Sequence, residues 1–368
     1  MCPGILYNHH YDQSKSNLQK INYIILILLA SVPLILNAQT GDSSQIISAG
    51  NVYIKKMDQF LAVKLSTSND IKNFTVKNTT KYEINPNDKS ILKLSANYRW
   101  LSGSVSITPD FLNGNNNDML KGKTTTTAFA LNLNFTHWSQ TFSYARIKGF
   151  YLKNTADYIP NWRKGIDPYL QFPDLVYNGY AGQTAYTFNK NFSFNALSAQ
   201  TERQLKSAGT FRPSVSYNFD LVDNKIVLTG QDSSQKSKNL QVVLSAGYYH
   251  SFVINKNFYF SAGLVPGIGI ISTKFYNRQV SSTIITRYLN VLYHSEATFA
   301  AGYNSERFFI GGQLTGVTSG YDQHTISTFI TTQGLTYQVF AGYRFGAPKF
   351  LKNALDKVEE KTKSPGNW

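Results

Sequence analysis

The chain has 368 residues, of which 42% are hydrophobic and 14% aromatic, and its formal net charge is +15. This composition excludes simple disorder and leaves both globular proteins and β-rich membrane proteins open. The single cysteine, Cys2, lies at the extreme N-terminus. Disulfides, a cysteine nucleophile and thiolate metal sites are therefore excluded from the folded part of the chain.

The N-terminal residues have the pattern of an export signal. Two lysines precede an apolar run from Ile21 to Leu36, and a small residue, Ala38, follows it. This pattern predicts a cleavable signal peptide over residues 1–38. A membrane anchor helix is the alternative, but the run is short for a span of roughly 20 residues. We then expect a periplasmic lead-in over residues 39–59. The sequence after it holds no second apolar run that could cross a bilayer as a helix.

Alternation of apolar and polar side chains begins near residue 61 and continues to Phe345. In one long example Leu92, Leu94 and Ala96 share a face while polar side chains take the other, which indicates a β-strand. Segments with this pattern include 61–67, 90–100, 102–108, 129–136, 140–152, 215–221, 225–231, 240–254, 258–271, 288–303 and 335–345.

Three further segments have the pattern of a hairpin tip, in which polar residues separate two aromatic-rich runs. The first is Tyr186–Phe194, with Asn189, Lys190 and Asn191 at its centre. Phe252–Phe260 repeats this pattern, and Tyr303–Ile310 is a looser version. Tight polar turns between alternating runs predict β-hairpins at all three places.

Short turns and long loops alternate along the chain. We expect short turns near residues 100, 138, 190, 224, 256 and 305, with longer loops between them. Short periplasmic turns, long outer loops and strands of about 10 residues are typical of transmembrane β-barrels. On this topology, Lys153–Leu175 and Thr201–Gly209 are predicted to lie on the outer face, and the proline and aromatic residues of the first suggest a folded loop.

The predicted fold is therefore all-β. It is a transmembrane, antiparallel, up-and-down barrel over residues 60–346 with about 14 strands, or 12 if the shortest segments are not strands. A soluble sandwich or lipocalin-like barrel is the alternative, and the number and length of the strands disfavour it. Residues 347–368 form a charged tail in which apolar residues at helical spacing predict a short helix, with a frayed end as the alternative.

Few residues have the pattern of a catalytic or metal site. His294 and Glu296 lie two apart on one predicted strand, so both would point into the lumen, where a hydrolase could use such a pair. No motif fixes a nucleophile beside them, so a structural hydrogen bond is the preferred interpretation and catalysis is not favoured. The other histidines are far apart in the sequence, and neither a metal site nor a cofactor is expected.

Basic residues outnumber acidic ones on the predicted lumenal face. The candidates for binding there are Arg99, Arg146, Lys148 and Arg344. A cationic lumen would favour anions; the alternative is that these side chains lie near the periplasmic rim and neutralise carboxylates or lipid phosphates. Arg146 and Lys148 share a face with Phe142 unless a bulge switches the strand.

Several short segments together resemble a known family. They are Asn97–Leu101, Leu120–Thr124, Lys148–Leu152, Gln171–Leu175 and Thr201–Gly209. They are similar to the domain-of-unknown-function family 4421, exported proteins found mainly in Bacteroidota, over roughly residues 53–345. The resemblance implies an outer-membrane barrel, and because the family has no established activity it supplies no functional residues.

If that family shares a site, we expect it where these segments meet at the outer loops. The residues that could meet there are Asp174, Glu202, Arg203 and Lys206. The alternative is that the loop carrying the last three folds inward and plugs the lumen.

The expected location is the cell outer membrane. Outer-membrane lipid and lipopolysaccharide are the expected partners because an exported basic protein meets acidic surfaces. The final strand ends in an aromatic residue, which resembles the signal read by the barrel-assembly machinery, so this machinery is an expected partner during biogenesis. No nucleic-acid motif is present. A pore or selective transporter for small or anionic solutes is the leading function. The alternatives are a lipid-modifying or hydrolytic enzyme and a structural or adhesive protein acting through its long loops.

Overall fold

The computed structural model describes residues 52–69, 74–77, 81–87, 90–112, 114–229, 233–321 and 332–363. The predicted signal peptide, 1–38, lies outside these residues, as does most of the lead-in predicted over 39–59. The chain divides into two units, one of which is Gly50–Pro348, while helix α4 (Lys349–Lys363) belongs to the other. The helix falls in the charged tail where the spacing predicts one. Among the described residues, no helix is long and apolar enough to cross a membrane.

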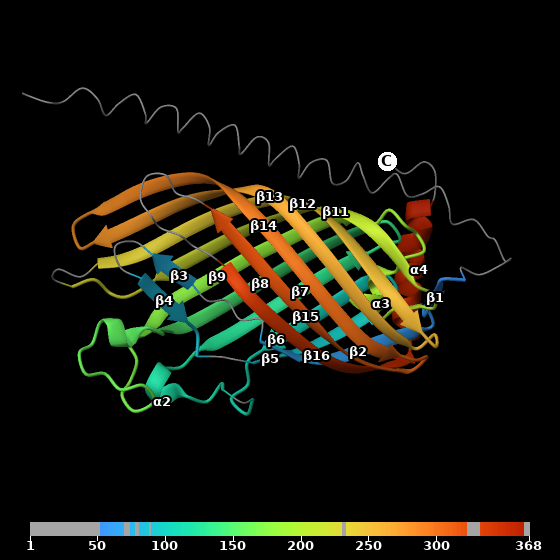
Figure 1. The fold of residues 1–368 in the computed structure, drawn as a ribbon, viewed down its shortest axis with the longest axis horizontal. Helices are drawn as coiled ribbons and strands as arrows, with labels where there is room; N and C mark the ends of the chain where they lie inside the picture. The colour runs from blue at the N-terminus through green and yellow to red at the C-terminus, as the bar shows by residue number, and fades with distance from the viewer. Residues whose placement is uncertain are drawn as a thin grey trace, which may run out of the picture. The chain divides into compact units, whose positions relative to one another are not determined.

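Twelve antiparallel strands of the larger unit form a closed ring (Figure 1). In ring order they are β2 (Phe60–Ser68), β5 (Ile91–Tyr98), β6 (Leu101–Ile107), β7 (Thr125–Asn134), β8 (Trp138–Leu152), β9 (Gln171–Tyr186), β11 (Ala208–Asn224), β12 (Ser233–Ile254), β13 (Phe258–Gln279), β14 (Thr283–Asn304), β15 (Phe308–Tyr321) and β16 (Thr332–Gly346). The ring closes where β16 pairs with β2. Because every other pairing joins strands that follow each other along the chain, the predicted antiparallel up-and-down barrel is confirmed.

The ring has the 12 strands kept as the alternative count, because two segments predicted as strands are not. The second half of the first hairpin becomes helix α3 (Phe194–Leu197), where the Ser193 side chain caps the helix by accepting from the Ala196 amide. Phe192 is buried against Ala208 and Tyr249 instead of facing outward. Residues 225–229, the described part of the other segment, follow β11 without strand structure.

A hairpin outside the ring occupies the connection between β2 and β5, which the sequence predicted as a plain loop. It consists of β3 (Phe74–Lys77) and β4 (Lys81–Asn85), and β4 pairs with the end of β8. Glu83 of β4 forms ion pairs with Lys81 of the same strand at 2.5 Å and with Lys153, which directly follows β8, at 3.0 Å. The second ion pair joins the hairpin to β8. Two short helical turns, α2 (Asp118–Lys121) and η2 (Thr155–Asp157), lie in the loops at this end.

Side chains on the ring alternate as predicted, with apolar residues outward and polar residues inward. On β2, Leu65 is 51% exposed while its neighbours Lys64 and Ser66 are buried on the inner face. Buried serines recur inward on the next strands, at Ser95 and Ser102. The ring therefore has an apolar outer surface and a polar interior.

The turns near residues 100, 138, 256 and 305 are short and lie at one end of the ring, which we call the short-turn end. The prediction was wrong near residue 224, because Asp223 pairs with Val176 and Lys236 at the opposite, long-loop end. It was also wrong near residue 190, which belongs to a longer connection. These two errors inverted the side on which Thr201–Gly209 was predicted: it lies at the short-turn end, whereas Lys153–Leu175 is at the long-loop end.

The position of a β-bulge near the C-terminal end of β8 determines the direction of two side chains that were predicted to face the lumen. The pairing of β8 with β9 shifts between Lys148 and Phe150. Below this point Phe142 faces outward and Ile147 is buried inward, so Arg146 and Lys148 lie on the outer surface. Their predicted lumenal position was wrong because the bulge comes after them. The residue at the bulge, Gly149, has φ +88°, and a Cβ there would come within 2.0 Å of the Lys123 carbonyl oxygen.

We expect Gly149→Ala to destabilise the barrel by about 2 kcal/mol or more, because alanine disfavours this backbone conformation and its methyl group has no room. Urea unfolding of the refolded protein in detergent measures the change. Gly103→Ala is the matched control, since no atom lies within 4 Å of its added Cβ. Equal stability of the two variants would contradict the assignment of the bulge.

Candidate functional site

The connection between β9 and β11, residues 187–207, folds inward at the short-turn end, and we call it the plug segment. It contains α3 and the short strand β10 (Glu202–Gln204). Gln204 holds its two halves together: the side-chain oxygen accepts from the Ser193 amide at 2.8 Å, and the side-chain nitrogen donates to the Asn191 carbonyl at 2.7 Å. The plug segment is therefore a compact turn with its own internal hydrogen bonds.

A strand from the lead-in covers the plug segment. Strand β1 (Ile54–Lys56) pairs antiparallel with β10, so that Ile54 lies opposite Gln204. The Met57 amide also donates to the Thr201 carbonyl at 3.1 Å. The sequence showed no period over this stretch because the strand has only three residues.

Contacts of the plug segment reach strands around the whole ring. Lys64 on β2 donates to the Ser198 carbonyl at 2.5 Å, and Asn195 donates to the Asn134 carbonyl on β7 at 3.2 Å. Phe194 packs against Tyr249 of β12. Since these partners belong to separate parts of the ring, the segment crosses the interior, as the alternative of an inward-folding plug predicted.

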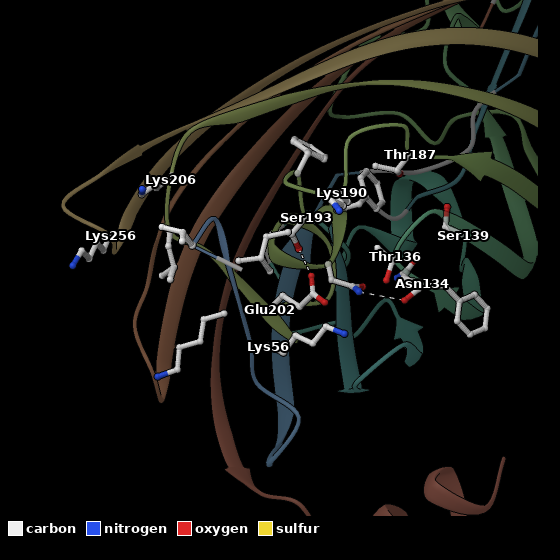
Figure 2. Close-up of a pocket in the computed structure, with 18 residues that line it drawn as sticks. Lys56, Asn134, Thr136, Ser139, Thr187, Lys190, Ser193, Glu202, Lys206 and Lys256 are labelled. Atoms are coloured by element: carbon white, nitrogen blue, oxygen red, sulfur yellow. Dashed lines mark hydrogen bonds between the residues drawn. The ribbon is translucent and has the colours of Figure 1, made fainter. Parts of the chain in front are cut away.

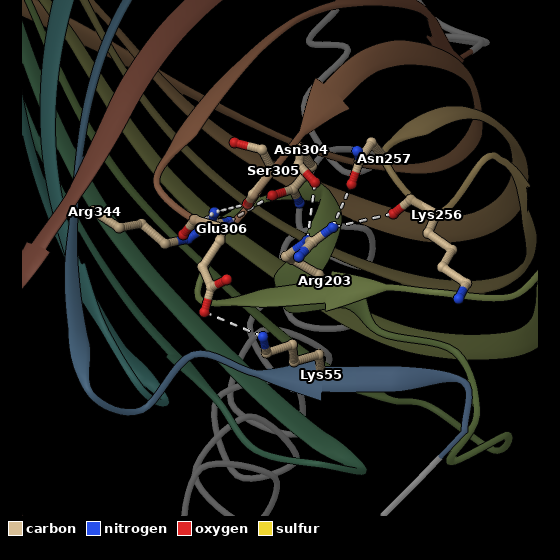
Figure 3. Close-up of polar contacts among 8 residues, drawn as sticks. All are labelled: Lys55, Arg203, Lys256, Asn257, Asn304, Ser305, Glu306 and Arg344. Atoms are coloured by element: carbon tan, nitrogen blue, oxygen red, sulfur yellow. Dashed lines mark hydrogen bonds and ion pairs between the residues drawn. The ribbon is translucent and has the colours of Figure 1, made fainter.

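Arg344 on β16 ties the plug segment to the wall, and Figure 3 shows its contacts with Asn304 and Ser305. Its side chain is completely buried. Nε donates to the Gln200 carbonyl of the plug segment at 2.9 Å, while Nη1 and Nη2 donate to the Ser305 carbonyl and to Asn304 Oδ1, both at 2.6 Å. The predicted inward orientation is thus observed, and the guanidinium is bound by neutral oxygens.

Arg203 on β10 makes the complementary contacts from the plug segment. Its Nε donates to the Asn304 carbonyl at 2.9 Å, and Nη2 donates to Asn257 Oδ1 at 2.5 Å (Figure 3). Asn304 therefore binds both arginines. Burial lowers the pKa of Arg203, although arginine stays charged at neutral pH. Removing an acceptor from a buried guanidinium is strongly unfavourable, so the two arginines fix the plug segment against two turns.

A cavity of about 750 Å³ lies between the plug segment, β1 and the barrel wall (Figure 2). Its charged lining consists of Lys55, Lys56, Lys190, Lys206, Lys256 and Glu202. Lys55 is engaged in an exposed ion pair with Glu306 at 3.2 Å. With five lysines to one carboxylate, the lining attracts anions.

Glu202 is the acidic group of this cavity. Burial raises the pKa of its carboxyl, while the hydrogen bond from Ser193 Oγ at 2.6 Å and the charge of Lys56 oppose the rise. The protonated form is the one that burial favours, so the contribution of Glu202 to stability is greatest below its ordinary pKa. That contribution is lost as the pH rises through the raised pKa.

The remaining predicted residues lie away from the plug segment. Arg99 is in the turn between β5 and β6, with φ 51°. Asp174 is at the long-loop end, where its carboxylate lies 3.8 Å from Lys148 Nζ. The predicted meeting of Asp174 with Glu202, Arg203 and Lys206 is therefore wrong, because the topology puts them at opposite ends of the ring.

His294 and Glu296 both lie on the inner face of β14. His294 Nδ1 is 2.8 Å from Ser319 Oγ on β15, and the two residues are direct partners in the sheet. Glu296 accepts from Thr298 Oγ1 at 3.1 Å. Ser319 could not be predicted as the partner of His294 from sequence, because their contact depends on the register between β14 and β15. No cluster of three or more His, Cys, Asp or Glu that could hold a metal occurs in the described part of the chain.

Sequence reasoning missed the uncharged residues that organise the site. Asn304 directly follows the predicted strand 288–303 and carries no charge, so nothing distinguished it from other turn asparagines. Gln200 is fully buried and has φ 60°. Lys64, which is charged, falls on the polar face of the predicted strand 61–67, but its Ser198 acceptor was hidden because the predicted hairpin continued as a strand there.

Comparison with known proteins identifies a family. A family model described as Domain of unknown function (DUF4421) matches residues 42–345. No curated protein matches the chain. Among solved structures, the outer membrane protease OmpT from Escherichia coli is 8% identical with a TM-score of 0.35, covering 81% of this chain and 100% of that chain. An outer membrane protein OmpT of Vibrio cholerae is 10% identical with a TM-score of 0.28, covering 79% and 99%. The translocator domain of autotransporter NalP from Neisseria meningitidis is 9% identical with a TM-score of 0.26, covering 78% and 88%.

We expect Glu202→Gln to raise the unfolding temperature at neutral pH, because the amide keeps an acceptor for Ser193 without a buried charge. The gain should shrink as the pH falls, since wild-type Glu202 is then protonated. Thermal unfolding followed by circular dichroism across pH values checks this. Glu306→Gln, which removes an exposed carboxylate from an ion pair, should show no such gain. A gain for Glu202→Gln that is the same at every pH would contradict the role of the buried charge.

Proposed function

Because the chain belongs to the DUF4421 family, a domain of unknown function, we propose a function from its own geometry: it is an outer-membrane barrel that admits small anionic solutes and is gated by the plug segment. The observation that carries the proposal is the lysine-lined cavity beside that segment. Rings of lysine and arginine in a passage favour anions over cations. The plug segment closes the interior at the same place, so solute binding and closure would be linked.

The outer surface supports a membrane location. Outward apolar side chains of β12, β13 and β14 are exposed, and Leu244, Ile268 and Tyr293 among them are more than half exposed. From Phe258 to Ile270 this apolar belt covers about 30 Å along the barrel axis, given roughly 3.4 Å per residue and a strand tilt of about 40°. That height matches the hydrocarbon core of a bilayer. A belt of this size would be unfavourable in water.

Gating follows from how the plug segment is held. Its contacts with the wall through Arg344, Arg203 and Lys64 are hydrogen bonds that can be broken and remade. Displacing the segment leaves Lys64 without its Ser198 acceptor and one donor of Arg344 without the Gln200 carbonyl, so the closed form is favoured when no ligand is bound. An anion in the cavity would compensate lysine charge and change that balance.

We expect wild-type protein in planar bilayers to open rarely and Arg344→Met to open several-fold more often, because the variant removes the hydrogen bond that holds the Gln200 carbonyl of the plug segment against the wall. In a potassium chloride gradient the reversal potential should show anion preference, and Lys190→Gln with Lys206→Gln should reduce it. The control Arg163→Met removes an arginine at the long-loop end, where it is paired with Asp167, and should behave as wild type. Silence of both wild type and Arg344→Met, or a cation preference, would contradict the proposal.

A hydrolase is the second candidate, favoured by the contact between His294 and Ser319. A histidine within hydrogen-bond distance can activate a serine, and a third group that orients the histidine completes such a site. Glu296 is engaged with Thr298, which weakens this candidate. Adhesion through the long loops stays a prediction.

The hydrolase candidate predicts that a fluorophosphonate probe labels Ser319 of the refolded protein. Labelling should disappear in Ser319→Ala and His294→Ala, and persist in Ser261→Ala, which changes another inward serine. Mass spectrometry of the labelled peptide identifies the site. Absence of labelling in wild type would exclude this candidate without affecting the transport proposal.

A further inference from the structure

Three cations form a row across the outer surface of neighbouring strands. Lys238 on β12 lies directly opposite Lys274 on β13, and Lys274 lies opposite Arg287 on β14. Directly opposed residues in an antiparallel sheet share a face, with Cβ atoms about 5 Å apart. We call these three residues the basic row.

The basic row faces outward. Lys238 is an even number of residues from Leu244, Lys274 from Ile268, and Arg287 from Tyr293, and the three apolar residues are 51–67% exposed on the outer surface. Along β12, β13 and β14 the pairing keeps one register between these positions. Since side chains alternate between faces, the cations continue the same outward columns.

The basic row has no acidic partner among the described residues. Asp223, the nearby carboxylate, is instead paired with Lys236 at 3.2 Å and Arg278 at 2.8 Å. The ring of Tyr276 lies 4.9 Å from Lys274 Nζ and 6.0 Å from Lys238 Nζ. Like charges placed directly opposite each other destabilise a sheet, so an external anion would relieve this repulsion.

The height of the basic row indicates the source of that anion. Lys274 is four residues beyond Ile270, the last apolar residue of the belt on β13, which places it about 10 Å farther along the barrel axis. The polar headgroup layer begins where the hydrocarbon ends. Lysine and arginine side chains can also extend toward that layer from above. The cations therefore stand where lipid phosphates lie, with an apolar surface for acyl chains directly below.

We propose that the basic row binds the phosphates of a lipid headgroup in the leaflet at the long-loop end, with the acyl chains against the apolar belt on β12, β13 and β14. Tyr276, two residues beyond Lys274 on the same face of β13, positions the two lysines through the contacts of its ring. This site rests on the membrane location and is separate from the solute cavity, which lies at the opposite end of the ring.

The test measures lipid binding to purified full-length protein in a non-ionic detergent by native mass spectrometry. The probes are lipid A with two phosphates, the same lipid without phosphate, and inorganic phosphate alone. We expect the phosphorylated lipid to bind at least tenfold more tightly than the other two probes. Lys238→Gln with Lys274→Gln should weaken it by about thirtyfold, given the usual contribution of each cation near a lipid surface.

The control is Arg146→Gln with Lys148→Gln, which removes two outward cations of β8 at the same end and should retain binding. In lipid-free detergent the Lys238/Lys274 variant should be at least as stable as wild type, because it removes repulsion. Unchanged binding by that variant, equal loss in the control, equal binding of inorganic phosphate, or a less stable lipid-free variant would each overturn the proposal.

Discussion

The buried guanidinium of Arg344 constrains the whole short-turn end. A charge in this position needs oxygen acceptors, and they come from the plug segment and from the turn between β14 and β15. Arg344 also lies on the strand that closes the ring against β2. The strand that closes the ring therefore also carries the side chain that holds the plug segment. A barrel that closed without the plug segment would leave a donor of this guanidinium unsatisfied, so the segment is part of the fold and not an addition to it.

Alternation predicted the strands well because it reports which face meets an apolar environment. It could not report whether that environment is lipid or protein. Phe252–Phe260 and Tyr186–Phe194 look alike in sequence, yet only the first is a hairpin, with Asn255 and Lys256 at positive φ in its turn. In the second, Phe192 packs against the plug segment's own neighbours and Ser193 caps a helix. That misassignment changed the strand count and contributed to placing Thr201–Gly209 at the wrong end of the barrel.

Four charged members of the candidate site were predicted from sequence, whereas the cavity lysines Lys55, Lys56, Lys190 and Lys256 and the partners of the arginines were not. They are Arg203, Glu202, Lys206 and Arg344, which stood out as charges in segments that are otherwise polar and uncharged. Asn304 and Asn257 lie 101 and 54 residues from Arg203, and their roles arise only from register. Ser319 became the partner of His294 for the same reason. Local pattern identifies residues that need a partner, whereas topology decides which partner each receives.

The cations of this barrel fall into two electrostatic classes. Inside, Lys64, Arg203 and Arg344 are satisfied by oxygens of the chain itself, which makes them structural. The lysines of the cavity and the basic row instead exceed the acidic groups around them. These two sets lie at opposite ends, separated by an apolar belt about 30 Å high, a distance well beyond the screening length at physiological salt. One anion cannot serve both, so a lipid at the long-loop end and a solute at the short-turn end would bind independently, and charge removed at one end should leave binding at the other unchanged.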